Sequence, residues 1–178
     1  MRLVYKFLKA GALLCSALAT GATAEILHHD SNPYLNDQYE IIKYMFIDLE
    51  VSKPSDKEVR IVIPTDYGFQ TGKFHLKRPM KDKLRQLSKV LNDYPESTID
   101  VVGHTDSIGK ESANMLLGQR RAESVSQVLL EGKVNPYRID TFSEGEELPK
   151  CSNASKEGRE CNRRVELYVM LEKELARF

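Results

Sequence analysis

Apolar residues along the chain either alternate or recur at helical spacing, and their order predicts a mixed fold. The pattern predicts a strand at residues 59–63, a helix from Pro79 to about residue 91, a strand at residues 99–102, a helix from about Lys110 to Glu131, and strands at residues 137–142 and 165–169. Strands and helices in this order build two-layer sandwiches. We therefore expect an α+β fold, a βαβαβ-type sandwich with one mixed sheet and the helices packed on one face.

Residues 1–24 have the pattern of a secretory signal peptide. Basic residues precede an apolar run from Ala10 to Ala19, and Ala22-Thr23-Ala24 forms a cleavage site. An uncleaved membrane anchor is the alternative, although the run is short for a span, which needs about 20 residues. Cys15 raises the further alternative of a lipoprotein, but it follows Leu14, where a lipobox has a small residue. We expect an exported mature protein.

Residues 25–57 are predicted to be a short N-terminal segment, followed by one domain at residues 58–178. Apolar positions between Leu35 and Leu49 indicate an amphipathic helix, and Ser52 to Asp56, with its proline, is interpreted as a connector. The helix either packs on its own domain or docks a partner protein. His28-His29 is a surface metal site or a solvated pair, and we assign no metal.

Asp106 stands where a strand gives way to the helix that contains Arg121. On a helical wheel of about 100° per residue, Arg121 falls in the middle of the apolar face, and Asn114 points in nearly the same direction. A guanidinium among aliphatic side chains is costly unless it is paired. One interpretation is a structural Asp106–Arg121 ion pair. The other is a clamp for a zwitterion, in which Asp106 takes an ammonium group, Arg121 takes a carboxylate and Asn114 adds neutral hydrogen bonds.

The motifs around these residues resemble a known family. They are Gly103-His104-Thr105-Asp106, Gly109, Asn114, Leu117, Arg121-Ala122, Val125, Gly145-Glu146, Pro149, Glu157-Gly158-Arg159 and Asn162-Arg163-Arg164-Val165-Glu166. In this order they resemble the OmpA-like peptidoglycan-binding domain. The resemblance implies noncovalent binding of the meso-diaminopimelate in the stem peptide.

The resemblance also assigns roles to single residues. The positions of Asp106 and Arg121 imply that they hold the ammonium and carboxylate of the diaminopimelate side chain, and Arg163 is implied to reach toward the ligand. Thr105 and Gly109 are expected to shape the loop. The implied protein anchors an envelope component to the cell wall, in the periplasm or at the outer membrane. The alternative is a structural subunit of an envelope-spanning complex, such as a secretion system or flagellar motor, with residues 25–57 holding the partner.

Two positions depart from the family pattern. Gly118 stands where the family usually has serine, and Ser143 stands where it usually has the first glycine of a GxGE turn. Loss of the hydroxyl at residue 118 is expected to remove a hydrogen bond near the ligand. Ser143 must avoid a backbone conformation that only glycine adopts easily.

Two cysteines follow the predicted signal peptide, Cys151 and Cys161. An even pair in an exported chain predicts a disulfide, which we expect here. A redox-active or metal-binding pair is the alternative, but the spacing is not CxxC and no histidine is near in sequence.

Catalysis is not predicted. His104 with Asp106 or Glu111 is a candidate acid–base or metal pair, but no orienting motif accompanies it. Ser107 and Ser112 lack the context of a nucleophile elbow. We interpret His104 as a structural residue whose ring bonds the turn. The 26 basic and 26 acidic residues balance, which gives no indication of a nucleic-acid surface, and no cofactor is expected.

Overall fold

The structure, a computed structural model, describes residues 33–171 of the chain. Its elements are α1 (Pro33–Met45), β1 (Glu50–Ser55), β2 (Glu58–Pro64), α2 (Thr65–Gly68), α3 (Arg78–Asp93), β3 (Ser97–His104), α4 (Glu111–Glu131), the 3-10 turn η1 (Pro136–Arg138), β4 (Ile139–Gly145), α5 (Lys156–Asn162) and β5 (Arg164–Leu171). The predicted signal peptide, Cys15 and His28-His29 lie outside the described residues.

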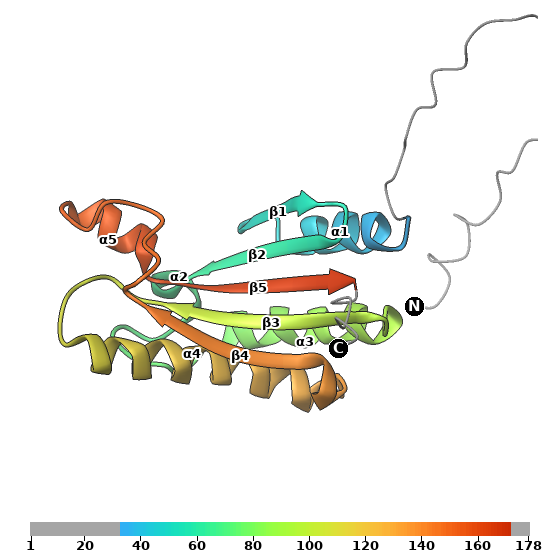
Figure 1. The fold of residues 1–178 in the computed structure, drawn as a ribbon. Helices are drawn as coiled ribbons and strands as arrows, with labels where there is room; N and C mark the ends of the chain where they lie inside the picture. The colour runs from blue at the N-terminus through green and yellow to red at the C-terminus, as the bar shows by residue number, and fades with distance from the viewer. Residues whose placement is uncertain (1–32, 172–178) are drawn as a thin grey trace, which may run out of the picture.

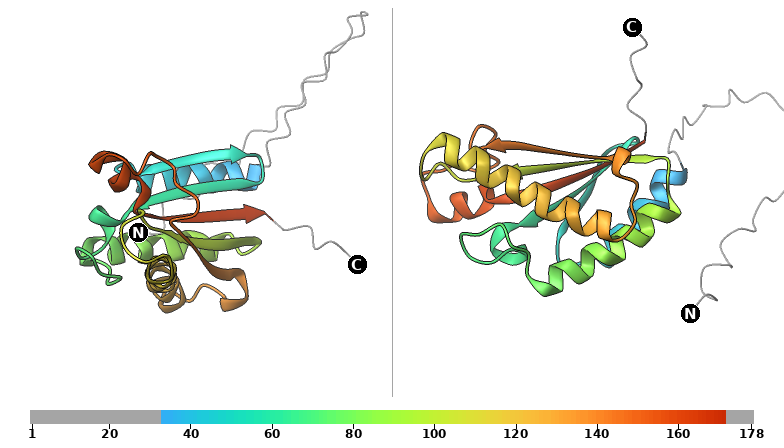
Figure 2. Two further views of the ribbon diagram at one scale, coloured as in Figure 1. Left: turned by 60° about the vertical axis from the view of Figure 1, so that its left-hand side comes forward. Right: turned by 90° about the horizontal axis from the view of Figure 1, so that it is seen from below.

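The strands form one sheet in the order β1-β2-β5-β3-β4. Neighbouring strands are antiparallel except β3 and β4, which are parallel. Helices α3 and α4 lie against one face of the sheet, and α1 packs beside α3 (Figures 1 and 2). The predicted α+β sandwich with one mixed sheet is therefore confirmed.

The core lies between this sheet face and the helices. Alternate residues of β2, β3 and β5 point into it, as the strand period of two requires, and Leu84 and Leu87 of α3 and Val125 and Leu129 of α4 meet them there, all fully buried. The same stripe of α4 buries Arg121 to 3% exposure. The predicted placement of a guanidinium on the apolar face of this helix is thus confirmed.

The described part of the N-terminal segment shares this core. Leu35, Ile42 and Phe46 are buried with the domain's own residues. The interpretation of Ser52 to Asp56 as a connector was wrong, because residues 50–55 form β1, which pairs with β2 at the edge of the sheet. A proline inside an edge strand is tolerated because its missing N–H need not face a partner, so Pro54 did not mark a break.

Three chain segments meet at one end of the sheet. Strands β2 and β3 both run antiparallel to β5, so their carboxyl ends lie beside the beginning of β5. The register places Pro64 and His104 on either side of Arg164. The residues that follow β2 and β3 are therefore brought next to Arg163, although they are far apart in sequence.

Candidate functional site

The same dipeptide follows both of these strands. Thr65-Asp66 follows β2, and Thr105-Asp106 follows β3. The guanidinium of Arg163 joins the two aspartates, because Nη1 donates to Oδ2 of Asp106 at 2.8 Å and Nη2 donates to Oδ2 of Asp66 at 2.7 Å. These hydrogen bonds, the one to Asp66 first, raise the pKa of Arg163 against the opposing effect of its burial.

Arg121 lies beside this cluster but has different partners. Its Nε donates to the carbonyl oxygen of Lys73 at 3.2 Å, and its guanidinium carbon lies 5.9 Å from the centre of the Phe69 ring. The Nη1 atom is buried and has no hydrogen-bond partner in the described chain. Burial lowers the pKa of Arg121, and Arg163 lowers it further, whereas Asp66 and Asp106 raise it. The Asp106–Arg121 ion pair of the first interpretation is replaced by an Asp106–Arg163 pair.

Two buried hydroxyl groups accompany the orphan nitrogen of Arg121. Thr65 and Thr105 are each 3% exposed, and the Oγ1 atom of each has no partner among the described residues. Buried polar atoms in folded proteins are nearly always hydrogen-bonded, so a group of unpaired ones needs an explanation. Each threonine directly precedes one of the two aspartates in sequence.

The loop after Asp106 is held by side-chain hydrogen bonds. Oδ1 of Asp106 accepts from the backbone N–H of Ile108 at 3.1 Å. The Nδ2 atom of Asn114 lies 3.2 Å from the carbonyl oxygens of both Asp106 and Ile108, and 2.6 Å from Oε2 of Glu146. Gly109 has a φ of +112°, which side chains rarely allow. Asn114 and Gly109 thus shape the loop that presents Asp106.

The predicted disulfide is confirmed, and it closes the loop that precedes Arg163. Cys151 is bonded to Cys161. The fully buried side chain of Asn162 bonds the backbone N–H and carbonyl of Cys151 at 2.8 Å each, and donates to Oδ1 of Asn153 at 2.9 Å. That same oxygen accepts from the backbone N–H of Ser107 at 3.3 Å. The disulfide loop therefore supports both Arg163 and the residue next to Asp106.

The two departures from the family pattern turn out to be neighbours. A Cβ atom at Gly118 would collide with Oγ of Ser143 and come within 2.9 Å of the carbonyl oxygen of Gly103. Oγ of Ser143 instead occupies this space, where it donates to the Gly103 carbonyl at 3.4 Å and accepts from the N–H of Gly145 at 3.2 Å. The hydroxyl expected on the helix is supplied by the strand, and Ser143 keeps an ordinary negative φ.

His104 differs from its expected role. Its ring is 4% exposed, and neither ring nitrogen has a hydrogen-bond partner, so the ring does not bond the turn. Desolvation lowers its pKa to about 4, Arg164 lowers it as well, and Glu166 opposes them. Between residues 33 and 171 no group of three or more His, Cys, Asp or Glu side chains is placed to hold a metal ion.

Sequence reasoning missed Asp66. The residue lies in the short helix α2, for which the sequence pattern gave no prediction, and its ion pair with Arg163 spans 97 positions. A signal was nevertheless present, because the Thr-Asp dipeptide after an alternating strand occurs twice in the sequence. The other site residues were named from sequence and lie at or around one end of the sheet: Thr105, Asp106, Asn114, Arg121 and Arg163.

Fold and site together define a small α+β domain with a cluster of charged side chains at one end of its sheet. Residues 68–163 match the OmpA family, and the chain belongs to that family.

Relatives of known name support this assignment. The chain is 38% identical to outer membrane porin F of Pseudomonas fluorescens over 69% of its own length and 33% of the porin. It is 38% identical to outer membrane protein A of Bordetella avium over 66% of its length and 61% of that protein. It is 36% identical to the peptidoglycan-binding protein ArfA of Mycobacterium bovis over 48% of its length and 26% of ArfA. The chain thus spans only part of each relative.

Solved structures share the fold. The periplasmic domain of Helicobacter pylori MotB is 24% identical and matches with a TM-score of 0.62 over 70% of this chain and 82% of that one. The cell wall anchor of the T6SS from Pseudomonas aeruginosa is 24% identical, with a TM-score of 0.61 over 80% of this chain and 97% of that one. No helix within residues 33–171 is both long and apolar enough to cross a membrane.

Proposed function

We propose that this domain binds peptidoglycan noncovalently, through the diaminopimelate of the stem peptide, and so anchors an envelope component to the cell wall. The observation that carries the proposal is the buried, unpartnered Nη1 of Arg121 beside Asp66 and Asp106. The names of the relatives add support, since one of them is called a peptidoglycan-binding protein. A binding role without catalysis is in keeping with the OmpA family.

The chemistry of the site suits a group that carries both charges. A carboxylate can accept from Arg121 and so satisfy the orphan Nη1, because guanidinium and carboxylate form a matched pair. The adjacent ammonium can donate to Asp106, whose Oδ1 and Oδ2 each hold one hydrogen bond and have room for another. The hydroxyls of Thr65 and Thr105 can complete the contacts. Diaminopimelate ends in such a pair, whereas lysine has only the ammonium.

The test is calorimetric titration of the protein with a diaminopimelate stem peptide and with the same peptide carrying lysine at that position. We expect only the first to bind. Arg121→Ala should weaken binding by about 100-fold, because a charge-assisted pair in a buried site contributes about 3 kcal/mol. Arg85→Ala is the matched control, since that arginine is half exposed and, within residues 33–171, its ion pair is with Asp82. Equal binding of both peptides, or full binding by folded Arg121→Ala protein, would refute the proposal.

A second role is assembly with a partner protein in the periplasm, in which the domain anchors a complex at the outer membrane. Tyr44 and Ile47, at the end of α1 and just after it, are 83% and 84% exposed. Deleting residues 25–57 would not test this role, because Leu35, Ile42 and Phe46 belong to the core. The double substitution Tyr44→Ser, Ile47→Ser leaves the core intact. Loss of a co-purifying partner with retained wall binding supports assembly, and retention of every partner argues against it.

A further inference from the structure

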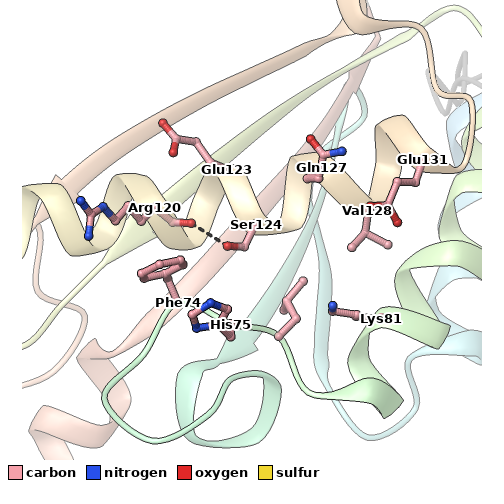
Figure 3. Close-up of a pocket in the computed structure, with 10 residues that line it drawn as sticks. Phe74, His75, Lys81, Arg120, Glu123, Ser124, Gln127, Val128 and Glu131 are labelled. Atoms are coloured by element: carbon pink, nitrogen blue, oxygen red, sulfur yellow. Dashed lines mark hydrogen bonds between the residues drawn. The ribbon is translucent and has the colours of Figure 1, made fainter.

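A groove outside the charged site lies between α4, the first turn of α3 and the loop before α3 (Figure 3). We call it the α3–α4 groove, and its volume is about 460 Å³. Its lining residues are Phe74, His75, Leu76, Lys81, Arg120, Glu123, Ser124, Gln127, Val128 and Glu131. A cleft of this size falls within the range of small-ligand sites, about 300–1,000 Å³.

One part of the groove is apolar and aromatic. Leu76 and Val128 are 5% and 3% exposed. The rings of Phe74 and His75 are stacked with their centres 4.4 Å apart, and the guanidinium of Arg120 lies over the Phe74 ring at 5.4 Å. Phe74 is held from two sides, while His75 is exposed. The groove therefore offers a ligand a flat aromatic surface that neighbouring side chains hold in place.

The other part of the groove carries polar side chains that have no partner among the described residues and lie at least partly open to solvent. The side chains of Lys81, Gln127 and Glu131 form no hydrogen bond or ion pair with the described part of the chain. The lining carries two cations, Lys81 and Arg120, and two carboxylates, Glu123 and Glu131, of which Glu123 accepts from Nε2 of Gln119 at 3.1 Å. This balance of charge does not favour an ion. It favours a neutral ligand that needs several donors and several acceptors at once.

We propose that the α3–α4 groove binds an N-acetylated amino sugar of the peptidoglycan glycan strand. A sugar ring has an apolar C–H face that packs on an aromatic ring, and its hydroxyl and acetamide groups both donate and accept. Gln127 offers an amide to the acetamide, and Lys81 and Glu131 serve the hydroxyl groups. This inference rests on the proposed function, because it assigns a second part of the same polymer to a second part of the same domain.

The position of the groove fits a polymer that reaches both places. Lys73, whose carbonyl accepts from Arg121, directly precedes Phe74 in the groove wall. On α4, Arg121 and Arg120 are consecutive, the first in the charged site and the second in the groove. A stem peptide is joined to an amino sugar of the strand, and three extended residues reach about 10 Å. One muropeptide can therefore occupy the charged site and the near end of the groove.

The test compares three ligands by titration calorimetry: the diaminopimelate stem peptide, the same peptide attached to its disaccharide, and glycan strands freed of peptide. We expect the disaccharide to tighten binding at least tenfold, and His75→Ala and Gln127→Ala to remove that gain while peptide affinity stays unchanged. Both residues are exposed, so folding is not at risk. Tyr137→Ala, an aromatic residue that is 95% exposed elsewhere, is the matched control.

The ligands separate this inference from the proposed function. Peptide-free strands should bind Arg121→Ala protein as well as wild type, and bind Gln127→Ala protein at least tenfold more weakly. If the strands bind in this way while the stem peptide does not bind at all, the proposal for the groove is supported and the proposal for the charged site is refuted. If the disaccharide adds no affinity, or if its gain survives in both groove variants, the inference is overturned and the charged site is unaffected.

Discussion

Substituting Gly118 by serine would restore the residue usual in the family, yet we expect it to destabilise this protein. The new Cβ would come within 2.9 Å of the Gly103 carbonyl oxygen and would overlap Oγ of Ser143. Overpacking of this kind costs about 1–3 kcal/mol, and the better helix propensity of serine returns only about 0.5 kcal/mol. The free energy of unfolding should therefore fall by about 1–2 kcal/mol.

The effects of substitutions at residues 118 and 143 should depend on each other. Ser143→Gly alone should also destabilise, by about 1 kcal/mol, because it removes the hydrogen bonds to Gly103 and Gly145 and adds a flexible residue to β4. Combining it with Gly118→Ser removes the overlapping atom and lets the helix hydroxyl take over the vacated space. The double variant should be more stable than Gly118→Ser alone.

The measurement is urea denaturation of the wild type, both single variants and the double variant, followed by circular dichroism. The coupling energy of the cycle should be about 1–2 kcal/mol in the stabilising direction. Distant, independent sites add to within about 0.5 kcal/mol. Additivity at that level would refute the idea that one hydroxyl has moved from helix to strand, and would leave the two departures as unrelated substitutions.

Other consequences concern the loops and the buried ionisable groups. Asn153→Ala removes the oxygen that accepts from the N–H of Ser107 and from Nδ2 of the buried Asn162. Stem-peptide affinity should fall about three- to fivefold in calorimetry, and the free energy of unfolding should fall by about 1–3 kcal/mol. His104 has its pKa lowered to about 4 from 6.5. It adds nothing to stability above pH 6.5, and costs up to about 3 kcal/mol as the pH falls to 4, because only the unfolded chain takes up the proton. His104→Leu should flatten this part of a pH series of urea melts. Arg138 donates to three backbone carbonyls, so Arg138→Ala should cost about 3 kcal/mol and Arg138→Lys nearly as much.

Local patterns predicted the central elements because their causes are local. Alternation in β2 and β5 and helical spacing in α3 and α4 reflect which side chains face the core, and Arg121 was found because it interrupts such a stripe. Helix α5 escaped notice for the same reason, since Asn162 is its only buried residue and it has no apolar face to detect. Its place is fixed by the disulfide and by side-chain hydrogen bonds to the backbone.

The arrangement of the charges was harder to predict, because it depends on strand order. Asp66, Asp106 and Arg163 come together only when β5 lies between β2 and β3, and the hydrogen bonds that join them span 97 and 57 positions. With the strand order unknown, helical spacing paired Asp106 with Arg121, and Arg163 was placed toward the ligand only by the family resemblance. The ion pair therefore differs from the predicted one because of the strand order. The candidate ligand groups stay the same.

Under the proposed function, the observed pairing would favour a zwitterion over a ligand with either charge alone. Two carboxylates and two guanidinium groups balance, but they are not paired alike. Arg163 joins both aspartates, whereas Arg121 keeps a buried nitrogen without a partner. A ligand with only a carboxylate would satisfy Arg121 and bring its negative charge close to Asp66 and Asp106. A ligand with only an ammonium would reach the aspartates and add a third cation beside an unsatisfied one. Only a group that carries both charges meets both needs, and this requirement follows from the contacts of Arg163 as much as from those of Arg121.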